Sequence, residues 1–197
     1  MALSDAELML LVRQGDEDAF IELVGRYQKK LLNFFYRLGW DYHLSEDLTQ
    51  EVFLRVYRHR GHYEETAKFQ TFIYRIARNL WIDQVRKRRV RPDAVSLERE
   101  VKGRDEPGTL SDLLADERAE PPADAPDRSE IGRAIRQAVA ELDEPDRVLF
   151  AMVTRQEMKY RDIAEVLGIP EGTVKSKVFY MYRKLRERLG GMKPDEM

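Results

Sequence analysis

The sequence predicts an all-α protein of two small helical domains joined by a flexible acidic linker, the second domain containing a helix-turn-helix. Apolar residues recur at helical spacing through most of the 197 residues. No segment alternates strictly over the length of a strand, and no Asn-Gly or Asp-Gly hairpin turn occurs. From about Val90 to Asp127 the periodicity fades, and Pro107-Gly108 and Pro121-Pro122 are typical of a linker.

The first two predicted helices carry clear start signals. Ser4 with Glu7 predicts a capping box, which opens a short helix through Val12. Asp16 is the expected cap of a longer helix that Gly39 ends. The apolar face of that longer helix comprises Phe20, Leu23, Val24, Tyr27, Leu31, Phe34, Phe35 and Leu38.

Two more helices complete the first domain. Ser45 is the expected cap of the third helix, with Glu46 and Asp47 in its first turn. A polar loop is predicted for residues 61–67, and a fourth helix for 69–89. Residues expected inside on the fourth helix are Phe72, Ile73, Ile76, Ala77, Leu80 and Val85. The predicted domain is residues 1–90, followed by the linker 91–127.

The second domain is predicted to span residues 128–190, before a disordered tail at 191–197. Helicity resumes at Ser129, and Pro145 opens the next helix. The helix-turn-helix follows: Gly168 breaks a short helix, and Pro170 begins another. Its expected buried stripe is Val174, Val178 and Leu185, and its opposite face carries Thr173, Lys175, Ser176, Lys177 and Tyr180.

A second helix with a polar N-terminal half is how this motif enters the major groove of DNA. The alternative is an ordinary helical hairpin with solvated lysines. The overall charge of −2 argues against a nucleic-acid partner, but the charge is segregated. Residues 68–91 have a net charge of +7, residues 92–130 of −7, and residues 155–188 of +4. Each block is expected to act on its own partner, because salt screens charges more than about 10 Å apart.

The composition excludes several classes of protein. There is no cysteine, so disulfides and thiolate metal sites are excluded. No apolar run approaches the length of a membrane span, and the N-terminus lacks the pattern of a secretory signal. We therefore expect a cytoplasmic protein that does not insert into membranes.

Two helices carry surfaces that could bind a partner. On the third helix, Asp47, Glu51 and Leu54 share a face with Gln50 alongside, which is either a solvated face or a docking face. The fourth helix mixes basic residues with Phe72, Tyr74 and Trp81. Exposed aromatic rings stack on unpaired bases and arginine binds phosphates, so this helix suggests single-stranded or melting DNA. The alternative is that its aromatic residues belong to the core.

Three motifs in order give the sequence a family resemblance. They are Glu46-Asp-Leu-Thr-Gln-Glu-Val-Phe-Leu54, Phe69-Gln-Thr-Phe-Ile-Tyr-Arg-Ile-Ala-Arg-Asn-Leu-Trp-Ile-Asp-Gln-Val-Arg-Lys-Arg-Arg89, and Gly168-Ile-Pro-Glu-Gly-Thr-Val-Lys-Ser-Lys177. Together they resemble an extracytoplasmic-function (ECF) sigma factor of bacterial RNA polymerase. The resemblance covers nearly all of residues 5–189.

The resemblance implies partners and a role for each motif. The first domain would dock on core RNA polymerase, at the clamp helices of its largest subunit, through Asp47, Gln50, Glu51 and Leu54. The fourth helix and the loop before it would recognise and melt the −10 promoter element through His62, Lys68, Thr71, Tyr74, Arg75, Arg78, Asn79, Arg86, Arg88 and Arg89. The second domain would lie by the polymerase flap region and read the −35 element through Thr173, Lys175, Ser176, Lys177, Phe179, Tyr180 and Arg183. An anti-sigma factor is a further expected partner, and the free protein is expected to be a monomer.

The sequence departs from the family pattern at a few positions. Phe72 stands where many relatives carry tryptophan, and Tyr180 and Tyr182 stand where arginine is frequent. The rival interpretations are a stand-alone helix-turn-helix regulator that binds duplex DNA without polymerase, an anti-sigma or adaptor protein, and an enzyme. No catalytic motif or cofactor site supports the enzyme. His59 and His62 could bind a metal, but are expected on a solvated loop.

Overall fold

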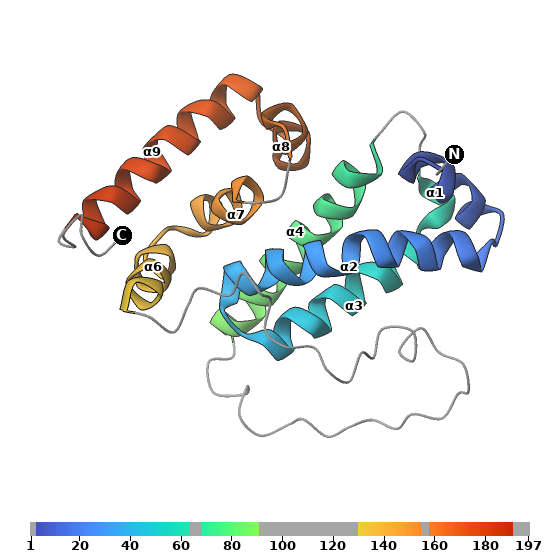
Figure 1. Cartoon of the computed structure of the whole chain (residues 1–197), viewed down its shortest axis with the longest axis horizontal. Helices are drawn as coiled ribbons and strands as arrows, with labels where there is room; N and C mark the ends of the chain where they lie inside the picture. Colours follow the sequence, from blue (N-terminus) through green and yellow to red (C-terminus); the bar gives the residue numbers. More distant parts are fainter. Residues whose placement is uncertain (1–2, 64–67, 91–129, 155–157, 191–197) are drawn as a thin grey trace. The chain divides into compact units, whose positions relative to one another are not determined.

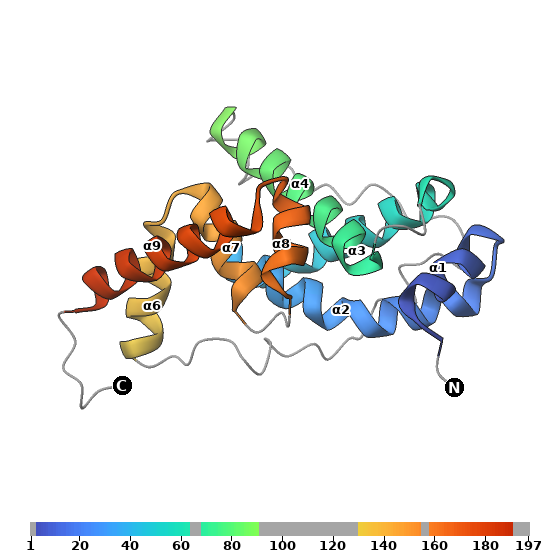
Figure 2. The same cartoon turned by 90° about the horizontal axis from the view of Figure 1, so that it is seen from above.

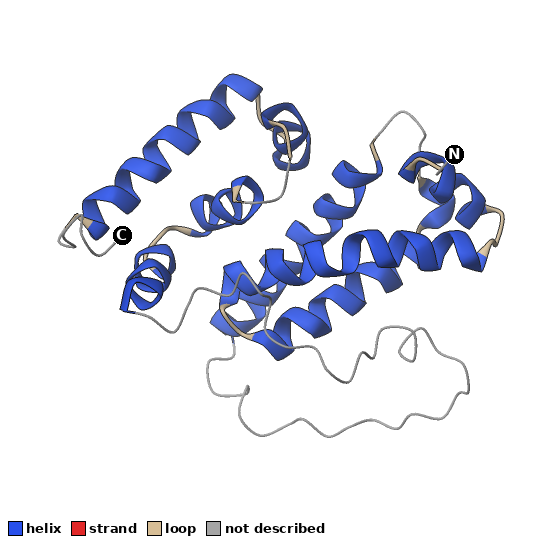
Figure 3. Ribbon diagram, in the orientation of Figure 1, coloured by secondary structure: helices blue, strands red, loops and turns tan. Residues whose placement is uncertain are grey.

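The computed structural model describes residues 3–63, 68–90, 130–154 and 158–190. All regular structure in these ranges is helical and no strand occurs in them, which confirms the all-α prediction (Figure 3). The predicted linker 91–127 and tail 191–197 lie outside the described residues.

The chain divides into two compact units. Of the described residues, the first unit comprises 3–25, 47–63 and 68–90, and the second comprises 26–46, 130–154 and 158–190. The helices in chain order are α1 (Asp5–Arg13), α2 (Glu17–Gly39), α3 (Tyr42–Arg58), the 3-10 turn η1 (Arg60–His62), α4 (Phe69–Val90), α6 (Glu130–Ala140), α7 (Glu144–Val153), α8 (Tyr160–Leu167) and α9 (Glu171–Leu189). The division falls within α2 and α3, and the domain boundaries expected from the sequence stay a prediction.

The capping signals of α1 and α2 act as predicted. The backbone N–H of Ser4 donates to Glu7 Oε2 at 2.7 Å, and the N–H of Glu7 donates to Ser4 Oγ at 3.3 Å. The Ser4 hydroxyl also donates to Glu7 Oε2 at 2.7 Å, and this bond, together with that from the Ser4 backbone N–H, favours the charged carboxylate and lowers the pKa of Glu7. Asp16 Oδ1 accepts a bond from the N–H of Ala19 at 2.9 Å, which caps α2.

The predicted start of α3 is wrong. The helix begins at Tyr42, and Asp41 caps it by accepting a bond from the N–H of Leu44 at 3.1 Å. Ser45 lies inside the first turn, where its hydroxyl donates to the carbonyl of Asp41 at 2.6 Å. Asp41 is as good a cap as serine, and it comes first in the chain. Between α2 and α3 the left-handed residue is Trp40, with φ of 53°, whose ring packs on Tyr36 with centroids 5.5 Å apart.

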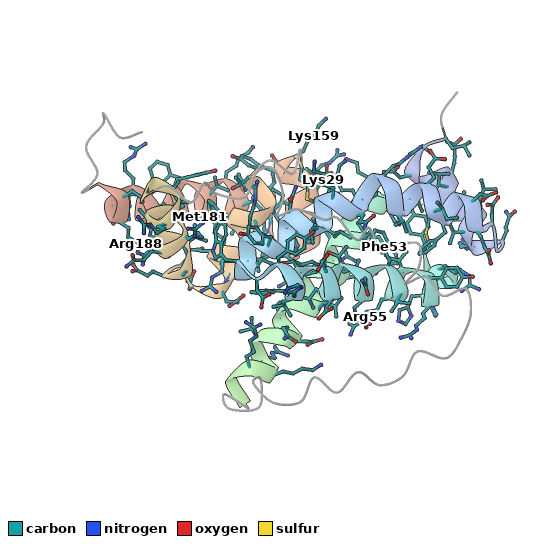
Figure 4. The ribbon with its side chains drawn as sticks, turned by 60° about the horizontal axis from the view of Figure 1, so that its bottom comes forward. Lys29, Phe53, Arg55, Lys159, Met181 and Arg188 are labelled. Carbon is teal, nitrogen blue, oxygen red and sulfur yellow. The ribbon has the colours of Figure 1, made fainter. Side chains whose placement is uncertain are left out.

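Aromatic side chains form much of the core of the first unit. The rings of Phe20 on α2 and Phe53 on α3 meet edge to face at 6.3 Å, and Figure 4 labels Phe53 among the surrounding side chains. Tyr63, predicted in a polar loop, is instead buried against Phe69, with ring centroids 6.2 Å apart. Arg13 donates to the carbonyl of Tyr63 at 3.3 Å and so ties α1 to this segment.

The helix-turn-helix forms as predicted in the second unit. Gly168 adopts a left-handed φ of 70°, and its N–H donates to the carbonyl of Ala164 at 2.8 Å. Pro170 then precedes the first turn of α9. The predicted stripe is buried, with Met181 as a further member, and α6, α7 and α8 all contact α9 (Figures 1 and 2).

Replacing Gly168 by alanine is expected to lower the free energy of unfolding by about 1–2 kcal/mol, because a Cβ is strained at this positive φ. Urea denaturation would measure the loss. Gly172→Ala is the matched control in the same motif, since its Cβ would meet open space in a helical conformation. Gly172→Ala should keep or slightly raise the free energy of unfolding. Equal losses of stability in both variants would show that the positive φ of Gly168 is not the cause.

Candidate nucleic-acid interface

The outer face of α3 presents the four residues predicted to dock on a partner. Asp47 is exposed, and Gln50, Glu51 and Leu54 are half-buried. Glu51 Oε1 accepts a bond from Nε of Arg55 at 2.8 Å, and Figure 4 labels this arginine. The core side of the helix consists of buried Leu48, Val52, Phe53 and Val56. The face therefore offers carboxylates, an amide and one aliphatic side chain to solvent.

The fourth helix places most of its predicted DNA-binding residues at the surface. The exposed ones, with the preceding turn, are His62, Lys68, Arg75, Asn79 and Arg86, and the half-buried ones are Arg78 and Arg88. The side chain of Arg89 lies outside the described residues. The surface is strongly basic, because along α4 the only acidic residue is Asp83.

Two of the residues predicted to contact DNA are buried. Thr71 is 1% exposed and Tyr74 is 0% exposed, so neither side chain can reach a base in this conformation. Trp81 is also buried, and Phe72, expected inside, is partly exposed. The physical reason is that α4 carries apolar residues on more than one face, and the face that packs inward includes Tyr74 and Trp81. The aromatic surface predicted on α4 is therefore reduced to the partly exposed Phe72.

The seven residues predicted to read DNA on α9 share its solvent side. Thr173 is half-buried, and the exposed ones are Lys175, Ser176, Lys177, Phe179, Tyr180 and Arg183. Phe179 and Tyr180 are 65% and 51% exposed, unusual for rings in a small domain, and their centroids lie 5.5 Å apart. Such a surface combines cations for phosphates with apolar groups for base edges.

Carboxylates pair with two of these cations, which the sequence reasoning missed. Lys175 Nζ lies 2.8 Å from Glu171 Oε1, and this hydrogen bond raises the pKa of Lys175. Arg183 Nε lies 3.7 Å from Glu187 Oε1, while its guanidinium sits 4.9 Å from the centre of the Tyr180 ring. The i, i+4 spacing of each pair was the signal that could have found them.

Two further ion pairs anchor α9 on its neighbours. Lys184 Nζ lies 2.6 Å from Oδ2 of Asp146 on α7, a carboxylate only 6% exposed, and this bond raises the pKa of Lys184. Arg188 Nε lies 3.0 Å from Glu141 Oε2, just beyond α6. Figure 4 labels Arg188 near one end of α9 and Met181 toward its middle. These pairs fix how α9 presents its outer face.

Replacing Lys184 by methionine is expected to lower the thermal midpoint at neutral pH, because it leaves the buried Asp146 carboxylate without its cation. The folded pKa of Lys184 is raised, so its stabilisation is full below the unfolded pKa and is lost as the pH rises through the folded value. The difference in thermal midpoint between the wild type and the variant should therefore shrink above about pH 10.5. A pH series of thermal melts checks this, and a difference that persists undiminished at high pH would contradict it.

Other kinds of site find no support in the part of the chain that the structure describes. No group of three or more potential metal-binding side chains occurs among those residues. His59 and His62 are both exposed, with ring centroids 6.0 Å apart. Among the helices described here, none is long and apolar enough to cross a bilayer.

Family models match both halves of the chain. The model of Sigma-70 region 2 matches residues 23–91, and the model of Sigma-70, region 4 matches residues 132–185. The first match includes α3 and α4, and the second includes the helix-turn-helix.

Relatives and solved structures agree with these matches. The chain is 35% identical over 178 residues to ECF RNA polymerase sigma factor SigW of Bacillus subtilis, covering 90% of this chain and 92% of SigW. It is 32% identical over 176 residues to RNA polymerase sigma-H factor of Pseudomonas aeruginosa, covering 89% of this chain and 88% of the relative.

The fold is also shared with proteins in two solved complexes. One is CnrH, solved in complex with the cytosolic domain of CnrY, with a TM-score of 0.68 at 18% identity over 96% of this chain and 99% of the other. The second is RpoE from Bartonella quintana, solved with the anti-sigma factor NepR, with a TM-score of 0.57 at 22% identity over 87% and 99% of the two chains. From the family models and the relatives together, the chain belongs to the ECF family of RNA polymerase sigma factors.

Proposed function

We propose that this sigma factor divides transcription initiation among three surfaces, one for core RNA polymerase and two for promoter DNA. The observation that carries the proposal is the position of two basic helices in different compact units, α4 in the first and α9 in the second. Each unit contains only one of these two basic helices. Promoter recognition would therefore require both units, held at promoter spacing by the enzyme.

The docking surface is the outer face of α3, comprising Asp47, Gln50, Glu51 and Leu54. It is supported by the exposure of Asp47 and by the separate, fully buried core side of the same helix. We propose that it binds the clamp helices of the polymerase largest subunit, and that the second domain lies by the flap region. Complementary charge at this contact would speed docking and fix its register.

The −10 surface is the exposed side of α4 with the turn before it, comprising His62, Lys68, Arg75, Arg78, Asn79, Arg86 and Arg88. Thr71 and Tyr74 are left out because they are buried. Arginines would bind the phosphates of the melted strand. Because the aromatic rings of α4 are mostly enclosed, we expect phosphate contacts to contribute more than base stacking on this helix.

The −35 surface is the outer side of α9, comprising Thr173, Lys175, Ser176, Lys177, Phe179, Tyr180 and Arg183. Polar residues of the N-terminal half would meet base edges in the major groove, as in other helix-turn-helix proteins. Phe179 is suited to apolar contact with a thymine methyl group.

In the proposed mechanism, the two units make separate weak contacts with DNA, and polymerase allows both to form at once. Binding to polymerase would turn each weak DNA contact into an intramolecular one and raise avidity without new contacts. Capture of unpaired bases, which exist only in the open promoter, would shift the equilibrium toward melting. The chain would thus open DNA by binding, without catalytic activity or a cofactor of its own.

We further propose an anti-sigma partner and action in the cytoplasm, where polymerase is found. One of the solved structures reported above is a sigma factor in complex with an anti-sigma factor, and the other is CnrH in complex with the cytosolic domain of CnrY. Such a partner would hold the free protein inactive by covering one or more of the three surfaces.

In vitro transcription with sigma-free core polymerase on a promoter library tests the function. We expect transcripts only when both proteins are present, and start sites that share two sequence elements. A stand-alone regulator would instead bind intact duplex tightly by itself and yield no transcript. That result would overturn the proposal.

A further inference from the structure

We propose that the recognition helix α9 limits its own affinity for DNA, because Glu171 and Glu187 compete with DNA phosphates for Lys175 and Arg183. The inference rests on one part of the proposed function, that the outer side of α9 contacts DNA. It adds a residue role that the family assignment does not supply, that of two carboxylates that weaken binding by the free protein.

The first pair lies at the start of the helix. Glu171 and Lys175 are one turn apart, and their charged atoms approach to 2.8 Å. Lys175 is on the same side of α9 as Phe179, four residues later, so its ammonium borders the DNA-reading surface. A phosphate that approaches this ammonium meets a cation already paired with the Glu171 carboxylate, which reduces its net attraction for the phosphate.

The second pair lies two turns further along. Arg183 follows Ser176 by seven residues and Phe179 by four, which places it on the same outer side. Its guanidinium is held between the ring of Tyr180, at 4.9 Å, and the carboxylate of Glu187, at 3.7 Å. Tyr180 therefore packs against the guanidinium, while Glu187 neutralises part of its charge through an ion pair that is too long for a hydrogen bond.

The two other ion pairs of α9 differ from these in where their carboxylates lie. Lys184 and Arg188 are also paired with carboxylates, but their partners lie outside α9 and tie it to the rest of its unit. The partners of Lys175 and Arg183 lie on α9 itself, so these two pairs do not link α9 to another helix. Both carboxylates are exposed, at 43% and 69% of the side chain, and would stand close to the phosphates of bound DNA as like charges.

Removing the two carboxylate charges tests the inference. For the full-length chain without polymerase, we expect E171Q and E187Q each to tighten binding to a short random-sequence duplex about threefold, and both together about tenfold, at about 50 mM salt. Fluorescence anisotropy of labelled duplex measures the dissociation constant. The gain should shrink at high salt, where exposed charges are screened.

The matched control is E141Q, which removes the carboxylate of another α9 ion pair. Arg188 lies beside the buried stripe, three residues after Leu185, so we expect E141Q to leave DNA affinity unchanged. Thermal melts of all variants show whether the fold is kept.

A second measurement separates competition from general repulsion. In a background that carries R183Q, the substitution E187Q should lose most of its effect, because the cation for which it competes is gone. The inference is overturned if E171Q/E187Q fails to tighten binding, or if E187Q acts equally with and without Arg183. Transcription with core polymerase is measured separately, so failure of the sigma-factor function would be seen there and not in these titrations.

Discussion

Charge reversal of Asp47 and Glu51 to lysine is expected to weaken binding to core RNA polymerase by a factor of about 100 or more. Both residues lie on the outer face of α3, and reversal would set lysines where the partner is expected to be basic. The core side of the helix is formed by other residues, so the fold should survive. Biolayer interferometry with immobilised core enzyme would measure the loss.

The control for this prediction is Glu165→Lys, which makes one such charge reversal at an exposed position of α8, half the total charge change of the double variant. It should leave polymerase affinity within about twofold of wild type. The helical circular-dichroism signal and thermal midpoint of the double variant should stay near those of the wild type. Normal polymerase binding by a well-folded double variant would remove the docking surface from α3.

Tyr74 and Arg75 are neighbours in sequence for which the structure predicts opposite consequences. Tyr74→Ala is expected to lower the free energy of unfolding by about 3–5 kcal/mol, because it empties a fully buried aromatic site. Arg75→Ala should cost less than about 1 kcal/mol, because that residue is exposed. It should instead reduce promoter opening about fivefold, through loss of a phosphate contact.

Two measurements separate the two effects. Urea denaturation reports stability, and permanganate reactivity of unpaired thymines reports opening by the holoenzyme. Tyr74→Phe is the conservative variant, which keeps the ring and should remain folded. If Tyr74→Ala were as stable as wild type and failed only in opening, Tyr74 would return to the DNA-binding surface.

Helices with a single apolar face were predictable from sequence. All eight residues assigned to the inner face of α2 are buried, because that helix alternates cleanly between core and solvent. The three residues predicted to form the buried stripe of α9, Val174, Val178 and Leu185, are also buried. Both also carry unambiguous end signals, Asp16 for the first and Gly168 with Pro170 for the second.

Where two solutions of similar free energy existed, the sequence could not choose between them. Asp41 and Ser45 are both good caps, and the structure uses the earlier one. On α4, apolar residues lie on several faces, so periodicity alone could not tell that Tyr74 and Trp81 point inward while Phe72 lies partly outside. Tyr63 packs on Phe69, and its carbonyl accepts a bond from Arg13, which is fifty residues earlier in the sequence. Contacts between residues so far apart cannot be inferred from local periodicity.

The anchoring of α9 has a consequence for engineering. Asp146 and Glu141 hold the helix through Lys184 and Arg188, in its C-terminal half, whereas the residues proposed to meet base edges lie in the N-terminal half. The two sets do not overlap. A new promoter preference could therefore be grafted by exchanging the outer residues between Thr173 and Tyr180, yielding orthogonal transcription switches on an unchanged scaffold.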